Sequence, residues 1–170
     1  MIILGIDPGY AIVGWGVIEY SGSKFKVLGY GSIATQAHTP TEDRLVKIDE
    51  GIKLLVERYH PDVMAVEELF FNTNITTGIK VAEARGVIIM QAHAMGVKIA
   101  EYTPLQVKQA VVGYGRAEKK QVITMVTRIL GLEKPPKPDD TADALAMAIC
   151  HGHCSGSIAS GYNLRIRNGI

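Results

Sequence analysis

Four carboxylic acids in this chain have the residue type and spacing needed to bind divalent metal ions. They are Asp7, Glu67, Asp140 and Asp143. Asp7 and Glu67 each end a short apolar run, the place where a buried strand would stop. Asp140 and Asp143 are three residues apart, so they would share one face of a helix. Oxygen donors without a histidine or cysteine cluster favour Mg²⁺ or Mn²⁺ over zinc.

Asp143 is the acid that is hardest to explain as a surface residue. It lies beyond the first turn of a predicted helix whose neighbouring residues are almost all apolar. An unpaired buried carboxylate is costly, and a divalent cation is an effective partner for it. The other acids have structural explanations when taken singly: Asp7 would begin a turn, and Glu67 would be solvated at a strand end. Asp139 or Asp140 would cap the last helix.

The strands that must position these acids follow from hydrophobic patterning. Segments 2–7, 12–20 and 25–33 have short, glycine-marked connections and predict an antiparallel meander. Segments 63–67 and 97–101 are short strands between helices, the pattern of buried parallel strands. Open α/β sheets usually place their sites at the carboxyl ends of such strands. We therefore expect an α/β fold, with a mixed five-stranded sheet flanked by helices on both faces.

Helix boundaries follow from capping residues and prolines. Thr39 and Thr103 are predicted N-caps, each with a proline at the first helical position, and Glu42 would complete a capping box with Thr39. The proline-rich stretch 134–138 excludes helix and predicts an extended connector. Further helices are predicted at 75–95, 118–130 and 139–153. The last of them carries the acids of the C-terminal half.

Length and composition predict one domain. The chain has 170 residues, of which 47% are hydrophobic, enough for one core and too few for two typical domains. We expect a single domain over 1–154 and a mobile tail over 155–170, where small and polar residues dominate. No run of about 18 apolar residues and no signal-peptide pattern occurs, so we expect a cytoplasmic protein.

The formal net charge of +1 conceals an asymmetry between the two parts of the chain. Residues 1–70 carry 6 Lys/Arg and 10 Asp/Glu, whereas residues 71–170 carry 12 and 7. A basic surface beside clustered acids would suit a polyanionic substrate that approaches the acids through metal ions. An ordinary solvated surface is the alternative.

Two cysteines and two histidines lie near the C-terminal end of the last predicted helix. Cys150 and Cys154 are four residues apart, which predicts a shared helix face and reduced thiols rather than a disulfide. His151 and His153 lie between them but would project elsewhere. A zinc site is therefore the alternative, and a helix end with neutral imidazoles is the expectation.

Several short motifs extend the pattern of the four acids. They occupy residues 5–9, 14–16, 65–71, 84–86, 106–109, 112–113, 117–119 and 140–146. In this order and at this total length, they make the chain resemble the RuvC-type Holliday junction resolvases of the RNase H-like, or retroviral integrase, superfamily. The resemblance covers nearly the whole chain. It implies an RNase H-like fold and a crossover junction endodeoxyribonuclease of DNA recombination and repair.

The resemblance also implies roles for the acids. Asp7, Glu67, Asp140 and Asp143 would be both the catalytic residues and the metal ligands. Some family members have histidine at the position of Asp140, and a carboxylate there keeps every ligand atom an oxygen. Two Mg²⁺ ions about 3.5–4 Å apart, replaceable by Mn²⁺, would activate water and stabilise the leaving oxygen. The expected products carry a 5′-phosphate and a 3′-hydroxyl.

DNA contacts by Phe70, Lys108 and Lys119 are a further implication of the resemblance. The two lysines would lie near the scissile phosphate, and Phe70 would stack or wedge against bases at the crossover. Exposed lysines are common at helix ends, so a solvated surface stays an alternative for both. Arg85 has the alternative of pairing with Glu83. Weaker candidates for DNA contact are Phe71, Lys120, Arg116, Arg85, Arg165 and Arg167.

A homodimer follows from the implied reaction. Resolution of a four-way junction requires paired nicks on symmetry-related strands, and one active site supplies one nick, so we expect a C2 dimer. The candidate interface is a stripe on predicted helix 75–95, with packing inside the protomer as the alternative. The stripe consists of Ala82, Arg85, Gly86, Ile89 and His93. The expected partners are four-way junction DNA and a branch-migration motor with its junction-binding partner, of the RuvAB type.

Two other classes of function are compatible with parts of the sequence. An actin-like or sugar-kinase phosphate-binding domain also has an acid at a strand end, but it normally needs two such domains. A non-catalytic junction-binding or RNA-binding relative would share the fold, as would an RNase H-like nuclease with another substrate. The complete set of four acids argues against a protein that only binds.

Overall fold

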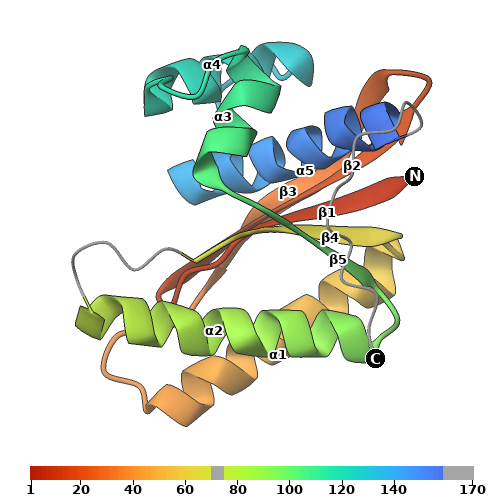
Figure 1. Ribbon diagram of the computed structural model, residues 1–170. Helices are drawn as coiled ribbons and strands as arrows, with labels where there is room; N and C mark the ends of the chain where they lie inside the picture. The colour runs from red at the N-terminus through yellow and green to blue at the C-terminus, as the bar shows by residue number, and fades with distance from the viewer. Residues whose placement is uncertain (70–74, 159–170) are drawn as a thin grey trace.

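The computed structural model describes residues 1–69 and 75–158, which form a five-stranded sheet with helices on both faces (Figure 1). The strands are β1 (Ile2–Asp7), β2 (Ile12–Ser21), β3 (Lys24–Ala34), β4 (Val63–Glu67) and β5 (Lys98–Tyr102). The helices are α1 (Thr41–Tyr59), α2 (Ile75–Ala94), α3 (Pro104–Val112), α4 (Lys119–Ile129) and α5 (Asp139–Ile158). The predicted α/β class and the mixed five-stranded sheet are confirmed.

The sheet has the strand order β3-β2-β1-β4-β5. Strands β1 to β3 form the antiparallel meander, and β1, β4 and β5 run parallel to one another. Ile6 in β1 is paired with Val66 in β4, so the next residues, Asp7 and Glu67, end neighbouring strands at the same edge of the sheet. The two strand-end acids are therefore brought together by strand pairing alone.

Alternate residues of the central strands face two separate cores, because successive side chains of a strand point to opposite faces. In β1, Ile3 belongs to the core beneath α3, α4 and α5, whereas Leu4 and Ile6 belong to the core shared with α1 and α2. Figure 1 shows α1 and α2 on one face of the sheet and α5 with α3 and α4 on the other. The sheet is thus covered on both sides, as predicted.

Helix α5 lies unusually close to the backbone of β1 and β2. A Cβ atom at Gly5 would overlap the carbonyl oxygen of Ala144, and a Cβ atom at Gly14 would overlap that of Asp140. Only glycine has no side chain at these points, so it permits this approach. The close contact brings the N-terminal turns of α5 over the strand end that carries Asp7.

The predicted cap of the first helix is wrong by one residue. Pro40, not Thr39, is the N-cap of α1, and no side chain caps this helix. The first helical hydrogen bond runs from the Arg44 N–H to the Pro40 carbonyl oxygen, so Glu42 lies within the first turn and forms no capping box with Thr39. The second predicted cap is confirmed: Thr103 caps α3 in a capping box with Gln106.

Helix α5 continues to Ile158, five residues beyond the predicted end at 153. The predicted tail, 155–170, therefore begins inside this helix, and residues 159–170 lie outside the described part of the chain. None of the helices in the described residues is long and apolar enough to cross a membrane.

The histidines near the end of α5 are engaged in contacts within the protein. His151 Nδ1 lies 2.7 Å from the Tyr102 hydroxyl, and burial lowers the pKa of His151 to about 4, so its imidazole is neutral. His153 Nδ1 lies 2.9 Å from the Ala110 carbonyl oxygen. A hydrogen bond from the buried Cys150 thiol lowers the pKa of Cys154 to about 7. Each imidazole thus has a hydrogen-bonding partner within the protein.

Candidate active site

The four candidate acids come from three elements that meet at one edge of the sheet. Asp7 and Glu67 are the last residues of β1 and β4. Asp140 and Asp143 lie in the first turns of α5, which is seated on β1 and β2. Thr141, which is fully buried between them, donates a hydrogen bond of 3.1 Å to the Gly31 carbonyl oxygen of β3. This bond ties the start of α5 to the sheet.

The carboxylates are close enough to perturb one another. Burial is the largest cause, and the negative charges of Asp143, Glu67 and Asp140 follow in that order; together they raise the pKa of Asp7 from 3.8 to about 7. The pKa of Glu67 is also raised, first by burial and then by Asp143. Shifts of this size, caused by desolvation and like charges, are typical of functional sites. The negative charges of the four acids therefore act on one another and favour the binding of a positively charged group.

Two lysines supply part of that positive charge. Lys119, at the start of α4, lies with its Nζ 2.9 Å from Asp143 Oδ2 and 3.8 Å from Asp139 Oδ2. The hydrogen bond to Asp143 raises the pKa of Lys119, so this amine stays protonated. Lys119 lowers the pKa of Asp7, and Lys108 lowers that of Glu67. Both predicted DNA-contacting lysines therefore lie beside the acids.

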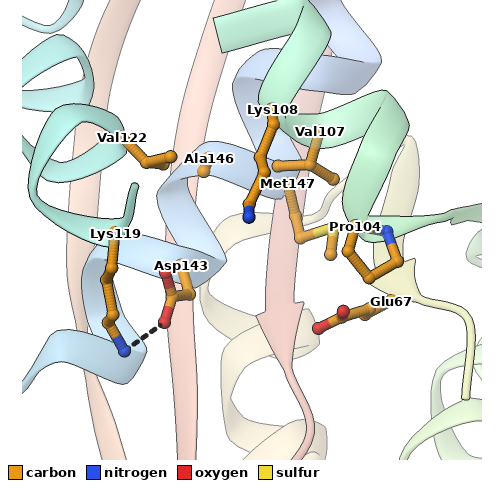
Figure 2. Close-up of a pocket in the computed structure, with 9 residues that line it drawn as sticks. All are labelled: Glu67, Pro104, Val107, Lys108, Lys119, Val122, Asp143, Ala146 and Met147. Atoms are coloured by element: carbon orange, nitrogen blue, oxygen red, sulfur yellow. Dashed lines mark ion pairs between the residues drawn. The ribbon is translucent and has the colours of Figure 1, made fainter. Parts of the chain in front are cut away.

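A cleft of about 260 Å³ contains both lysines and two of the acids. Figure 2 shows Lys108 and Lys119 extending from α3 and α4 into the cleft, where Lys119 meets Asp143 and Glu67 lies on the opposite wall. The apolar part of the lining consists of Pro104, Val107, Val122, Ala146 and Met147. The cleft thus combines carboxylates with cations on an apolar floor.

The donor set suits a hard divalent cation, because every candidate ligand atom is a carboxylate oxygen. In residues 1–69 and 75–158, however, no three acidic, histidine or cysteine side chains converge closely enough to hold one ion. The protonated Lys119 amine is bonded to Asp143. The chemistry of the acids fits a hard metal ion.

Arg85 has a structural role that the sequence did not reveal. Its Nε donates a hydrogen bond of 2.9 Å to the Glu67 carbonyl oxygen, and its guanidinium forms an ion pair with Glu101 of β5. The expected pairing with Glu83 is therefore wrong, since the acidic partner of Arg85 is Glu101. Arg85 instead fixes the end of β4 and, with it, the backbone of Glu67.

Of the other candidate DNA contacts, two lie in the described part of the chain and are at the surface. Arg116 and Lys120 are exposed, and Lys120 lines a separate groove with Tyr114. The remaining candidates lie outside the described residues: Phe70, Phe71, Arg165 and Arg167.

The candidate dimer stripe on α2 is only partly accessible. Gly86 and His93 are exposed, whereas Ala82, Arg85 and Ile89 are half-buried. A Cβ atom at Gly86 would meet no atom within 4 Å, so this face of α2 is open within the protomer.

Comparison with known proteins extends these observations to the family level. The family model for crossover junction endodeoxyribonuclease RuvC matches residues 3–151. The chain belongs to the RuvC family. A RuvC from Alkaliphilus metalliredigens is 56% identical over 165 residues, covering 97% of this chain and 100% of that protein. One from Clostridioides difficile is 58% identical over 153 residues, which are 90% of each chain.

The RuvC fold is also confirmed by a solved structure. The structure of Thermus thermophilus RuvC in complex with a Holliday junction substrate is 37% identical to this chain, with a TM-score of 0.87. The match covers 91% of this chain and 94% of that one. Family membership confirms the resemblance, the RNase H-like fold and the prediction of a crossover junction endodeoxyribonuclease. It is incompatible with the actin-like alternative.

Proposed function

We propose that this RuvC-family protein resolves Holliday junctions by paired, metal-dependent phosphodiester hydrolysis, with Asp7, Glu67, Asp140 and Asp143 as catalytic metal ligands. The observation that carries the proposal is the raised pKa of Asp7, which three other carboxylates and burial bring to about 7. Such mutual repulsion costs stability and is relieved when a divalent cation binds. The junction complex of the Thermus relative supports four-way DNA as the substrate.

Each acid has a distinct position in the proposed reaction. Asp7, which interacts with all three of the other acids, would hold metal together with Glu67 on one side and Asp140 and Asp143 on the other. When bound, two Mg²⁺ or Mn²⁺ ions would generate the nucleophilic hydroxide and stabilise the leaving 3′-oxygen, which gives 5′-phosphate and 3′-hydroxyl ends. Thr141 and Arg85 keep the acids in register by fixing α5 and the end of β4.

The lysines have a second role in the proposal. In the structure, Lys119 neutralises Asp143 through their 2.9 Å ion pair. A metal ion held by Asp143 would take over this neutralisation, and Lys119 would then contact the DNA backbone together with Lys108 from the facing wall of the cleft. Phe70, by family likeness, stacks on bases at the crossover. The ion pair between Lys119 and Asp143 would thus be replaced by a contact of Asp143 with metal and of Lys119 with DNA.

The proposed assembly is a C2 homodimer in the bacterial cytoplasm, acting with a RuvAB-type motor and junction-binding partner. Paired nicks require two active sites, and the open face of α2 around Gly86 is the proposed interface. The nuclease domain extends to the end of α5 at Ile158, beyond the boundary of 154 expected from the sequence, and Arg165 and Arg167 after it add diffuse attraction to DNA.

A nicking assay on a labelled four-way junction tests the assignment of the acids. With Mg²⁺, wild type should give symmetrical nicks, whereas Asp7→Asn and Asp143→Asn should lose cleavage but keep binding, measured in Ca²⁺. Asp139→Asn is the matched control: it removes a charge from the same turn of α5, but Asp139 is not among the groups that perturb Asp7. Binding without cleavage by wild type in both Mg²⁺ and Mn²⁺ would favour the non-catalytic relative instead.

A further inference from the structure

A second cavity adjoins the acids on the side away from the cleft of Figure 2. Its volume is about 510 Å³. Its lining consists of Gly9, Tyr10, Ala11, Ile12, Lys80, Val81 and Asp140. Asp140 does not line the first cleft, and Asp143 does not line the second, so the two cavities flank the pair of α5 acids. One wall is the turn between β1 and β2, and the other is the beginning of α2.

Two cations converge on the aromatic ring in this cavity. The Arg44 guanidinium carbon lies 3.8 Å from the centre of the Tyr10 ring, and Lys80 Nζ lies 5.0 Å from it. Cations over an aromatic face are attracted to its negative charge density. Lys80 lines the cavity together with the proposed metal ligand Asp140, whereas Arg44 contacts the Tyr10 ring and is not part of the lining.

The arginine and the tyrosine are held in place by hydrogen bonds. Arg44 Nε donates to Thr35 Oγ1 at 2.8 Å, and its Nη2 donates to the Tyr10 carbonyl oxygen at 3.2 Å. The Tyr10 hydroxyl donates to Thr41 Oγ1 at 2.9 Å. These bonds join the β1–β2 turn to the start of α1. Arg44 and Tyr10 are therefore held in place before any ligand binds.

Neither cation is neutralised by the part of the protein that the structure describes. In residues 1–69 and 75–158, no carboxylate lies within ion-pair distance of Arg44 or Lys80. Lys80 is exposed, whereas Arg44 is half-buried. Among the described residues, Lys80 is thus a cation without a carboxylate partner beside a cavity, which favours an anionic ligand. The pattern matches a site for phosphate oxygens rather than for a base, because the two cations already lie over the Tyr10 ring.

We propose that this cavity binds the DNA backbone next to the scissile phosphate, on the side of the acids opposite Lys108 and Lys119, through Lys80, with Arg44 adding positive charge at the Tyr10 ring. The inference rests on the proposed function, because a strand crossing the carboxylates must continue past both α5 acids. With cations at both ends of the acidic group, the strand would be held on either side of the bond that breaks. Tyr10 acts as a positioning residue for the two cations.

Lys80→Gln tests the charge with little risk to folding, since Lys80 is exposed and its only described contact is with the Tyr10 ring. The control is Lys98→Gln, an equally simple charge removal at the start of β5, the end of the sheet away from the acids. Junction affinity is measured by anisotropy in Ca²⁺ at several salt concentrations. Lys80→Gln should weaken binding several-fold and reduce the slope of log K against log salt by about 1 for each bound subunit.

A second pair of variants places charge in the cavity without removing a native contact of a side chain. Ala11 is exposed and lines the cavity, so Ala11→Glu and Ala11→Gln add nearly the same volume but differ in charge. The carboxylate variant should bind the junction several-fold more weakly than the amide variant, with equal melting temperatures. This comparison separates electrostatic repulsion of phosphate from steric blockage.

The outcomes separate this inference from the proposed function. If wild type binds and nicks the junction while Lys80→Gln matches Lys98→Gln in affinity and salt slope, the cavity is not a backbone site and the inference is wrong. Equal binding by Ala11→Glu and Ala11→Gln would contradict it in the same way. Failure of wild type to bind or cut any four-way junction would overturn the proposed function itself, and the inference with it.

Discussion

The surroundings of Asp7 disfavour its negative charge unless a cation binds beside it. Its carboxyl is shielded from water and faces three other acids, so its pKa of about 7 lies well above the ordinary 3.8. Lys119 offsets only part of the repulsion, because its closest contact is with Asp143. Charge that destabilises the folded chain is the same charge that would draw in a metal ion.

The pH dependence of stability should reveal this repulsion. Because the folded state holds the Asp7 proton more tightly than the unfolded state, the free energy of unfolding of the metal-free protein should fall as pH rises from about 4 to about 7. Asp7→Asn removes this titration. The variant should match wild type near pH 4 and exceed it by up to about 4 kcal/mol at pH 8. Urea unfolding in EDTA at both pH values measures the difference.

Asp139→Asn is the control for this pH series, because Asp139 is exposed and does not perturb Asp7. A stability difference between Asp7→Asn and wild type that stays constant from pH 4 to pH 8 would show that Asp7 has an ordinary pKa. Added Mg²⁺ should raise the stability of wild type at pH 8 and have less effect on Asp7→Asn.

Lys119 should compete with the metal for Asp143. Replacement by glutamine removes the amine that now bonds Asp143 Oδ2, so the DNA-free protein should bind Mg²⁺ or Mn²⁺ several-fold more tightly. Nicking at saturating metal should nevertheless fall, because the same amine would contact DNA. Calorimetric metal titration measures the first effect, with Lys120→Gln as the control on the same turn of α4. Weaker metal binding by Lys119→Gln would contradict this competition.

Individual site residues differed in how far the sequence predicted them. Asp7 and Glu67 were identifiable because a charge that ends an apolar run marks the end of a buried strand. The partner of Arg85 was not, because Glu101 lies 16 residues away on β5 and meets Arg85 only where α2 packs against that strand. The cationic group around Tyr10 was missed for the same reason: Arg44 and Lys80 come from different helices.

At the scale of secondary-structure elements, the contact between α5 and the sheet determines whether the acids meet. Gly14 of β2 lies under Asp140, where an added Cβ would overlap the helix backbone. The glycine is therefore needed for the position of α5 as well as for close packing. Any side chain at this point must move the helix, and the two acids it carries, away from Asp7.

Gly14→Ala should separate the two parts of the site. Overpacking of this kind typically costs about 1–3 kcal/mol, and the shift of α5 should also lower nicking far below wild type. Gly29→Ala is the overpacking control, because a Cβ there would meet the Tyr59 side chain of α1 and not the backbone of α5. Thermal unfolding and the nicking assay are measured on both. Full activity of Gly14→Ala would mean that the acids tolerate a displaced α5.

The two Thr-Pro motifs show where local sequence stops predicting helix boundaries. Thr103 caps α3 with Gln106 as expected, but Thr39, followed by the equivalent Glu42, does not cap α1. The difference comes from tertiary contacts: Tyr10 donates to the Thr41 hydroxyl, and Arg44 is bonded to the β1–β2 turn. These contacts hold the start of α1 in a position that the capping pattern alone would not give.

At the scale of the whole molecule, the topology was predictable because hydrophobic periodicity and connection length constrain it strongly. Short connections in the first part of the chain indicated antiparallel pairing, and intervening helices indicated the parallel strands that follow. The relation between two protomers is different. It depends on surface shape, and the stripe proposed from the sequence includes Arg85, which is committed to contacts inside the protomer.

The open face of α2 around Gly86 is the proposed dimer interface, and a bulky substitution there tests it. Gly86→Arg adds a large charged side chain where the protomer has free space, so loss of folding is not expected from internal clashes. If α2 forms the dimer interface, sedimentation should shift toward monomer, and paired nicks should give way to uncoupled single nicks. Leu54→Arg, at an exposed position of α1, is the control and should stay dimeric. A Gly86→Arg protein that remains dimeric and resolves junctions would place the interface elsewhere, because an arginine cannot be buried unpaired at the centre of a close helix contact.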